Sequence, residues 1–391
     1  MGNLWGTRSI APPGWLSDNE PVQQPHPSLR DPYLEWILAQ DPSAFDYDLG
    51  SSGLSVDWDW SAWGVDLSRM PAEGANWRGD DALRRRIATR IGADVGRILL
   101  APGTTGANTL VIAALIRPGD RVAVETPVYS PMENVVRAFG GEVVCLPRTE
   151  ALSWQFDPEA LAKALDGCSA CFVSNPHNPT GRLLTADDLG ALADACVAGG
   201  AALVVDEVYR EFPGGDRAPS AVTLGDHVVV TSSVTKAYGL GGLRVGWIAG
   251  SAREIDRFAE ASHLLFGRGS VPGEWLVERL FANEAAMAAF RARVAKQATD
   301  GRERIDRFLG GFNQIRWVAP DVGICGLVSL PDGVSGEEAA RRCRDEARVY
   351  VVPGEFFRAP NAMRMSFGTT METIEAGLAR IEPIFKTLDT G

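Results

Sequence analysis

The chain has 391 residues, of which 45% are hydrophobic and 23% are charged, and its formal net charge is −12. The length predicts two domains, or one large domain with a smaller partner, around a sizeable buried core. The negative charge argues against nucleic acid or an anionic membrane as a partner, because such partners attract basic surfaces.

Six scattered cysteines and a polar, proline-rich N-terminus predict a cytoplasmic protein with reduced thiols. No apolar run approaches about 20 residues, so no membrane span is expected. Cys168 and Cys171 have the spacing of metal ligands, but no second pair accompanies them. A structural zinc site needs four ligands, so we expect no metal.

The first 64 residues are predicted to form two segments. Residues 1–30 contain five prolines and are expected to form an extended arm. Residues 31–64, with a short helix at 30–40, are expected to join the smaller domain. Tryptophans alternate with Asp57 and Asp59 in this segment, and they belong to the core, to an interface or to the wall of a pocket.

After a helix at residues 81–91, apolar β-type runs alternate with helical patterns. The strands are expected at 98–101, 121–125, 142–146, 170–174, 202–206, 228–232 and 245–249, and the intervening helices at 107–115, 132–139, 158–165 and 187–198. This alternation predicts an α/β fold with a mainly parallel, seven-stranded sheet sandwiched by helices. We assign residues 65–290 to this large domain.

The pattern changes after residue 252. A helix to about residue 265 is followed by a glycine–proline break at 267–273 and a long helical region at 274–309. Strands at 315–318, 326–330, 349–352 and 363–367 then mix with helices at 336–347 and 372–388. Residues 291–391 are therefore predicted to form a smaller α+β domain.

Several candidate motifs follow the strands of the large domain, where parallel sheets bind their ligands. Gly103-Thr104-Thr105-Gly106 opens a helix and indicates either an anion site or an ordinary capped turn. Tyr129 follows the second strand and either stacks on a planar ring or lies in the core.

The next two strands also end in polar residues. Two Asn-Pro steps between Asn175 and Gly181 predict a rigid turn that can aim the Asn178 amide at a ligand, with His177 as turn filling. Asp206 ends a buried apolar strand and needs a partner. That partner is a protonated ring nitrogen, a helix terminus or an ordinary ion pair.

A lysine in an unusual setting follows the strand at 228–232. Ser233 precedes Lys236, and Arg244 follows it after a glycine-rich stretch. This arrangement suits an amine that forms an imine with a phosphorylated aldehyde, although a surface lysine in a loop is the alternative. Arg364 lies in an apolar strand of the smaller domain and meets either a substrate carboxylate or an internal acidic partner.

In chain order these segments resemble the fold-type I pyridoxal-phosphate-dependent enzymes, and the nearest match is the class I/II aminotransferase family. The resemblance extends from about residue 48 to the C-terminus. It implies a homodimer with pyridoxal 5'-phosphate as cofactor, active in amino-acid metabolism. It also implies transfer of an amino group between an α-amino acid and a 2-keto acid, by a ping-pong mechanism through aldimine and quinonoid intermediates.

The resemblance also implies a role for each motif residue. Lys236 would form the internal aldimine and move the α-proton, and Asp206 would keep the pyridine nitrogen protonated. The phosphate would bind Ser233, Arg244, Thr104, Thr105 and Gly106. Tyr129 would stack on the ring, Asn178 and Tyr209 would hold its phenolic oxygen, and Arg364 and Gly53, with Asn178, would contact the substrate.

Two positions depart from the family pattern. Gly74 stands where the family usually has a tyrosine that reaches the phosphate of the neighbouring subunit, and Ser55 replaces a proline. The Ser-Ser-Gly run at 51–53 and the tryptophan segment resemble capreomycidine-synthase-like members of specialised metabolism. A β/γ-eliminating lyase or cyclase is therefore the alternative function.

Substrate choice stays open in the sequence. Asp57 and Asp59 favour a basic side chain or are solvated loop residues, and Arg268 contacts an acidic side chain or lies at an interface. A regulatory domain that only binds the cofactor would need a fused DNA-binding segment, for which residues 1–30 are too short and not basic enough.

Overall fold

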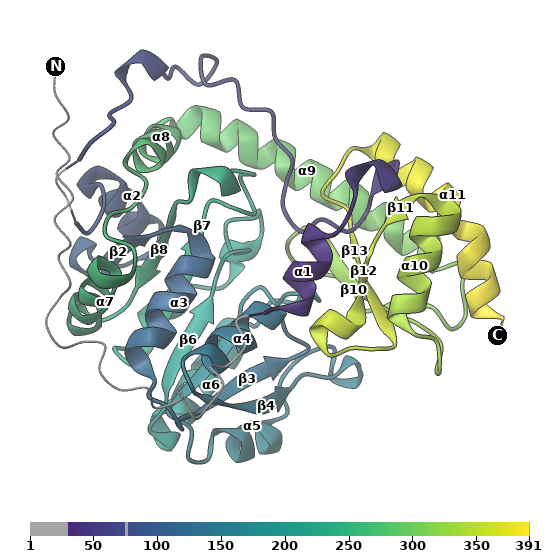
Figure 1. Ribbon diagram of the computed structural model, residues 1–391, viewed down its shortest axis with the longest axis horizontal. Helices are drawn as coiled ribbons and strands as arrows, with labels where there is room; N and C mark the ends of the chain where they lie inside the picture. Colours follow the sequence, from purple (N-terminus) through teal and green to yellow (C-terminus); the bar gives the residue numbers. More distant parts are fainter. Residues whose placement is uncertain (1–29, 75–76, 391) are drawn as a thin grey trace, which may run out of the picture.

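The computed structural model describes residues 30–74 and 77–390. The arm predicted at residues 1–30 therefore lies outside the described residues, apart from Arg30. The described chain forms a large seven-stranded sheet, a smaller four-stranded sheet and the helices that cover them (Figure 1).

The large sheet has the strand order β2-β8-β7-β6-β5-β3-β4. Its strands are β2 (Ile98–Ala101), β3 (Arg121–Thr126), β4 (Glu142–Pro147), β5 (Ala170–Ser174), β6 (Ala202–Asp206), β7 (Val228–Ser233) and β8 (Gly246–Ala249). All are parallel except β8, which runs antiparallel to both of its neighbours. The predicted, mainly parallel seven-stranded sheet is confirmed.

Helices cover both faces of this sheet, so its central strands are apolar on both sides. The helices α3 (Gly103–Leu115), α4 (Ser130–Ala138) and α7 (Ala252–Leu265) pack on one face, and α2 (Asp81–Ile91), α5 (Pro158–Leu165), α6 (Ala186–Gly199) and α8 (Val271–Ala282) on the other. Within β6, Val204 joins the first layer, whereas Leu203 and Val205 join the second. Such two-sided burial explains the uninterrupted apolar runs of the sequence.

The smaller sheet is antiparallel and has the order β12-β13-β10-β9. Its strands are β9 (Arg316–Trp317), β10 (Cys325–Ser329), β12 (Val352–Pro353) and β13 (Ala362–Ser366), and α10 (Gly336–Ala347) and α11 (Met371–Asp389) accompany it. The N-terminal segment meets this part of the chain, because β1 (Tyr47–Asp48) pairs with β11 (Val349–Tyr350). Helix α1 (Pro32–Leu38) packs there through Tyr33.

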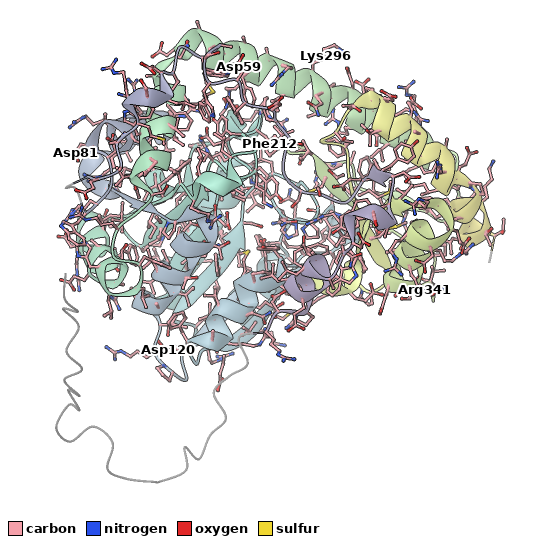
Figure 2. The ribbon with its side chains drawn as sticks, turned by 45° about the horizontal axis from the view of Figure 1, so that its top comes forward. Asp59, Asp81, Asp120, Phe212, Lys296 and Arg341 are labelled. Atoms are coloured by element: carbon pink, nitrogen blue, oxygen red, sulfur yellow. The ribbon has the colours of Figure 1, made fainter. Side chains whose placement is uncertain are left out.

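The helical region predicted at 274–309 is confirmed, and it consists of two helices. Helix α8 ends at Ala282, and α9 spans Glu284–Leu309. The backbone of Asn283 leaves the helical conformation, and its side chain accepts a hydrogen bond from the Ala286 N–H to cap α9. Helix α9 then leads to the smaller sheet (Figure 1). Figure 2 shows Phe212 inside the molecule and Lys296 on the outer side of α9.

The tryptophan segment at 57–63 packs on the core. Trp58 stacks on Trp60 at 5.3 Å and on Phe290 of α9 at 5.2 Å between ring centroids. The Trp58 indole Nε1 donates a hydrogen bond to the Tyr238 carbonyl oxygen at 3.0 Å. The segment therefore holds α9 against the loop that carries Lys236.

None of the helices in the part of the chain that the structure describes is long and apolar enough to cross a membrane. All six cysteines are free, and five of them are buried. The division of the chain at residue 290, which falls inside α9, stays a prediction.

Candidate active site

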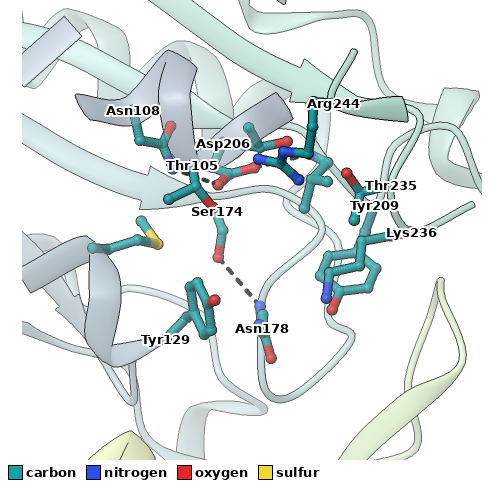
Figure 3. A pocket seen from close by; sticks show the side chains of 13 residues that line it. Thr105, Asn108, Tyr129, Ser174, Asn178, Asp206, Tyr209, Thr235, Lys236 and Arg244 are labelled. Carbon is teal, nitrogen blue, oxygen red and sulfur yellow. Dashed lines mark hydrogen bonds between the residues drawn. The ribbon is translucent and has the colours of Figure 1, made fainter. Parts of the chain in front are cut away.

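Most of the predicted site residues line one pocket of about 150 Å³ at the carboxyl ends of β3, β5, β6 and β7 (Figure 3). Gly53, Gly106, Ser233 and Arg364 are not part of its lining. The N-terminus of α3 forms one side of the pocket. The lining residues are Thr104, Thr105, Asn108, Tyr129, Met132, Ser174, Asn178, Asp206, Val208, Tyr209, Thr235, Lys236 and Arg244. Parallel βα units place polar strand ends together in this way.

Lys236 follows β7 and reaches into the pocket with a half-buried side chain. Its Nζ atom donates a hydrogen bond to Ser52 Oγ at 3.1 Å. Burial, and secondly the Arg364 guanidinium, lower the pKa of this amine to about 8. A Cβ atom at Gly53 would lie 3.7 Å from the Lys236 Cδ atom, so the N-terminal segment runs along the lysine.

Asp206 ends β6 as a buried carboxylate. Its Oδ1 atom accepts from the Val208 N–H at 3.0 Å, and its Oδ2 atom accepts from Asn108 Nδ2 at 2.9 Å. Burial raises the pKa of Asp206 to about 6, against the lowering effect of these donors and of Lys236. Within the described residues no cation forms an ion pair with it, which removes the internal ion pair from the alternatives that the sequence left open.

Hydroxyls and a guanidinium surround the first turn of α3. Thr104 Oγ1 donates to Ser233 Oγ at 2.7 Å. The Arg244 backbone is left-handed, with φ at 56°, and its Nη2 atom donates to the Pro102 carbonyl at 2.7 Å. Gly103, with φ at 73°, allows this approach because a Cβ there would lie 2.7 Å from Arg244 Nη2.

Gly106 lies in the same helical turn, and a Cβ on it would lie 2.7 Å from the Pro102 ring. Gly106 is therefore a packing position in the first turn of α3, and it is not one of the residues that line the pocket. The exposed Thr105 and half-buried Thr235 add hydroxyls at the open end.

The Asn-Pro turn lies across the pocket from Lys236, beside Tyr129 (Figure 3). The Asn178 N–H donates to Ser174 Oγ at 3.2 Å, and Ser174 in turn donates to the buried Glu125. His177 fills the turn, because its ring nitrogens bond Thr180 Oγ1 at 2.6 Å and the Pro127 carbonyl at 2.9 Å. Burial lowers the pKa of His177 well below its ordinary value, which keeps the ring neutral.

Arg364 projects from β13 of the smaller sheet toward Asn178 and is only 1% exposed. Its Nη1 atom donates to Asn178 Oδ1 at 3.3 Å, and Nη2 donates to the Tyr33 hydroxyl and to the Gly50 carbonyl, each at 3.0 Å. Its buried Nε has no partner. No acidic side chain of the described residues pairs with it, so this guanidinium keeps capacity for an added carboxylate.

Tyr209 is buried beside the same segment, and its hydroxyl donates to the Ser52 carbonyl at 3.2 Å. Burial raises the pKa of this phenol well above its ordinary value, so the hydroxyl keeps its proton. Tyr209 and Lys236 thus contact the same short stretch of the N-terminal segment.

The model of the family "Aminotransferase class I and II" matches residues 66–381. The chain belongs to this family. It is a pyridoxal-phosphate-dependent aminotransferase, whose substrates are amino acids and keto acids.

Individual aminotransferases align over most of the chain. The arginine–pyruvate transaminase AruH of Pseudomonas aeruginosa is 28% identical, with 76% of this chain and 78% of the relative covered. Aspartate aminotransferase of Geobacillus stearothermophilus is 27% identical, with coverage of 77% and 80%.

Solved structures of pyridoxal-phosphate enzymes share the fold. An aminotransferase of Streptococcus suis superposes with a TM-score of 0.84 at 22% identity, covering 91% of this chain and 97% of the other. The pyridoxal-phosphate-dependent cyclase OrfR has a TM-score of 0.77 at 26% identity, covering 95% and 100%.

The polar groups of the pocket of this aminotransferase match those of pyridoxal phosphate. The buried Asp206 carboxylate lacks a cation, the Lys236 amine has a depressed pKa, and Arg244 adjoins the helix N-terminus. A ring nitrogen that carries a proton, an aldehyde and a phosphate are the three groups that match them.

The sequence did not indicate the lining residues Asn108, Met132, Ser174, Val208 and Thr235, nor Ser52, which accepts the hydrogen bond of Lys236. Thr235 and Ser52 lie inside motifs that were recognised. Asn108 was hidden because the helix was predicted to start at 107, whereas α3 starts at Gly103. Ser174 is the last residue of its strand and gave no signal of its own.

The departure at Gly74 lies outside the pocket of this aminotransferase. The Gly74 carbonyl accepts a hydrogen bond from Arg268, whose guanidinium stacks 4.5 Å from the Trp77 ring. Arg268 is thus held at the surface beside the break between α7 and α8.

Proposed function

We propose that Lys236 binds pyridoxal phosphate covalently and moves the α-proton during ping-pong transfer of an amino group. The observation that carries this proposal is that the Lys236 amine lies in one pocket with the buried Asp206 carboxylate, where burial lowers the pKa of the amine to about 8. The bound cofactor supplies a ring that stabilises the negative charge left when an α-proton is removed. The other steps depend on residues of the chain.

The N-terminus of α3 and its neighbours hold the phosphate. Arg244 supplies the charge, Thr104, Thr105 and Ser233 supply hydroxyls, and the turn at Gly106 supplies backbone N–H groups. The N-terminus of a 13-residue helix attracts an anion through the same donors.

Three sides of the pocket fix the ring. Tyr129 stacks on one face, and the protonated Tyr209 hydroxyl and the Asn178 amide donate to the phenolic oxygen. Asp206 pairs with the ring nitrogen and keeps its proton there, because a buried carboxylate without a cation is costly. These roles are supported by the burial of Tyr209 and by the pocket position of Tyr129.

Arg364 binds the α-carboxylate of the substrate, beside Asn178 and Gly53. Its Nη atoms are already oriented by Tyr33, Gly50 and Asn178, and the unpartnered Nε leaves a donor for the ligand. A guanidinium held in this way loses little side-chain entropy when it binds.

Lys236 acts as the base because its amine, with a pKa of about 8, is partly neutral near neutral pH. The proton taken from the α-carbon is held at Nζ, where Ser52 Oγ accepts a hydrogen bond. The same Nζ would also be the group that gives this proton back, which would complete the transfer that the bound cofactor makes possible.

A homodimer and a cytoplasmic location complete the proposal. Exposed apolar residues gather where α7 ends: Leu264 is 85% exposed, and Leu265, Phe266 and Trp77 are exposed as well. The Trp77 ring centroid lies 5.2 Å from that of His263, which is in the last turn of α7, so Trp77 lies beside the end of this helix. An apolar group of this kind favours a second copy of the chain, and the buried free cysteines favour a reducing compartment.

The test is a substrate screen with Lys236→Ala and Lys163→Ala, an exposed lysine, as the matched control. Borohydride reduction of the loaded enzyme should attach the cofactor to the Lys236 peptide in wild type and in Lys163→Ala only. Amino acids, beginning with arginine and aspartate, are offered with pyruvate or 2-oxoglutarate. Covalent labelling and keto-acid release that persist in Lys236→Ala would overturn the proposal.

A second candidate function is cyclisation or elimination on the same cofactor. The observation that favours it is the alignment with the cyclase OrfR over its whole length and 95% of this chain. Mass analysis of the products separates the two: a keto acid and a newly aminated acceptor support transfer, whereas ammonia or a cyclic amino acid supports the second candidate.

A further inference from the structure

A buried side-chain relay lies behind Asp206. Asn108, on α3, donates from Nδ2 to Asp206 Oδ2 at 2.9 Å. Thr231, on β7, donates from Oγ1 to Asn108 Oδ1 at 2.6 Å. Strand pairing sets Thr231 beside Asp206, so a helix and two strands meet at this point.

The orientation of the Asn108 amide follows from these two contacts. A flipped amide would turn its oxygen toward the Asp206 carboxylate, which can only accept while it is ionised. The Thr231 hydroxyl serves the amide oxygen in the observed orientation. The contact with Thr231 therefore keeps an N–H of the Asn108 amide pointing at Asp206 Oδ2.

Among the residues that the structure describes, Asp206 receives hydrogen bonds from neutral donors only. The Val208 N–H occupies Oδ1 and the Asn108 amide occupies Oδ2. Such donors favour the ionised form of the carboxylate, but they carry no positive charge that would neutralise it. The charge thus stays available for a cationic ring nitrogen, whereas an internal arginine or lysine at this distance would compete for it.

We propose that Asn108 is a positioning residue that holds Asp206 ionised and oriented toward the cofactor nitrogen, with Thr231 fixing the amide of Asn108. This inference rests on the proposed pairing of Asp206 with that nitrogen. Asn108 acts through Asp206, and Thr231 acts through Asn108.

The first test measures the affinity of the apoprotein for pyridoxal phosphate by titration of tryptophan fluorescence. Asn108→Leu removes a hydrogen bond to a charged group and should weaken binding about 10- to 100-fold. Thr231→Val leaves the amide in place but unanchored and should weaken binding less, by about 3- to 10-fold. Thr231→Ser keeps the hydroxyl and should restore wild-type affinity.

The pH dependence of that affinity supplies a second readout. The other ionisable groups that face Asp206 are Lys236, after β7, and Tyr129, before α4. In Asn108→Leu the loss of affinity on acidification should begin at a higher pH than in wild type, because the carboxylate has lost a donor. A profile that coincides with that of wild type contradicts the inference.

A double-mutant cycle distinguishes positioning from packing. Asn108→Leu should have little further effect on affinity in an Asp206→Ala background, whereas a merely structural role would lower it equally in both backgrounds. If Asp206→Ala itself binds cofactor like wild type, the proposed role of Asp206 fails. If only Asn108→Leu behaves like wild type, the role of Asp206 stands and the inference fails.

Discussion

The ionisation of the Lys236 amine depends on residues from three parts of the chain. Its own loop buries it, Arg364 from the smaller sheet adds a like charge, and Ser52 from the N-terminal segment accepts its hydrogen bond. The first two effects lower the pKa, and an acceptor that binds the charged form more strongly opposes them. The protonation of this amine therefore depends on side chains that are far away in the sequence.

Ser52→Ala should move the pKa of Lys236 further down. The variant loses an acceptor for the protonated amine, so the neutral amine should appear about one pH unit lower. The rate at which the apoprotein binds pyridoxal phosphate covalently, followed against pH, measures this midpoint. Ser52→Thr keeps the hydroxyl and serves as the control, and an unmoved midpoint in Ser52→Ala would rule out the effect.

Arg364→Lys should weaken substrate binding without weakening cofactor binding. Lysine keeps the charge but loses the planar, bidentate fork, so the KM of the amino acid should rise about 10- to 100-fold. Steady-state kinetics with fluorescence titration of the cofactor check both parts. Arg348→Lys, an exposed arginine paired with Asp46, is the control. An equal loss of cofactor affinity would contradict the carboxylate role.

At the scale of elements, a partly buried polar contact joins the starts of two helices. Helix α8 begins at Val271, and Glu274 in its first turn accepts a hydrogen bond from the N–H of Asp80, the residue that caps α2. The contact joins two helices that cover one face of the large sheet. Burial raises the pKa of Glu274 to about 7.

Glu274→Gln should stabilise the protein at high pH. The carboxyl binds its proton more tightly in the folded than in the unfolded state, so the wild type loses stability as pH rises from about 4.5 to 7. Above pH 7 the variant should gain about 1–3 kcal/mol in the free energy of unfolding, and near pH 4 it should match wild type. Denaturant unfolding at both pH values measures this.

Glu284→Gln, an exposed glutamate in the first turn of α9, is the matched control and should change little at either pH. A Glu274→Gln variant whose stability follows that of wild type at every pH would refute the assigned cause.

At the scale of the molecule, one contact of the candidate site joins the edge of the large sheet to the smaller sheet. Asn178 from the large sheet and Arg364 from the smaller one share a hydrogen bond across 186 residues of sequence. Helix α9, held by Trp58 through Phe290, leads from one sheet to the other. The exposed apolar residues beside the end of α7 favour contact with a second copy of the chain.

Leu264→Glu combined with Phe266→Asp should produce a monomer if the proposed dimer forms there. A charge placed in an apolar interface is desolvated without a partner, which opposes association. Sedimentation equilibrium should report half the wild-type mass. Val197→Asp, an exposed apolar position on α6, should leave the mass unchanged. A double variant that keeps the dimeric mass would place the interface elsewhere.

The local pattern of the sequence determined the large sheet, its flanking helices and the strand-end motifs. The buried parallel strands are apolar runs that end in polar residues. The sequence therefore predicted that Asp206, Asn178 and Lys236 lie at one edge of the sheet, at the carboxyl ends of its strands. The break at Asn283 and the start of α3 at Gly103 were not visible, because helix ends depend on a side chain or a turn that local periodicity does not encode.

Only the tertiary structure decided what surrounds the motif residues. It placed Ser52 on the Lys236 amine, Tyr33 on Arg364, and Asn108 between Thr231 and Asp206. It also packed the partly buried tryptophans of residues 57–63 against the core. These contacts join segments that are distant in the chain, and their distances follow from how helices pack on sheets rather than from the spacing of residues.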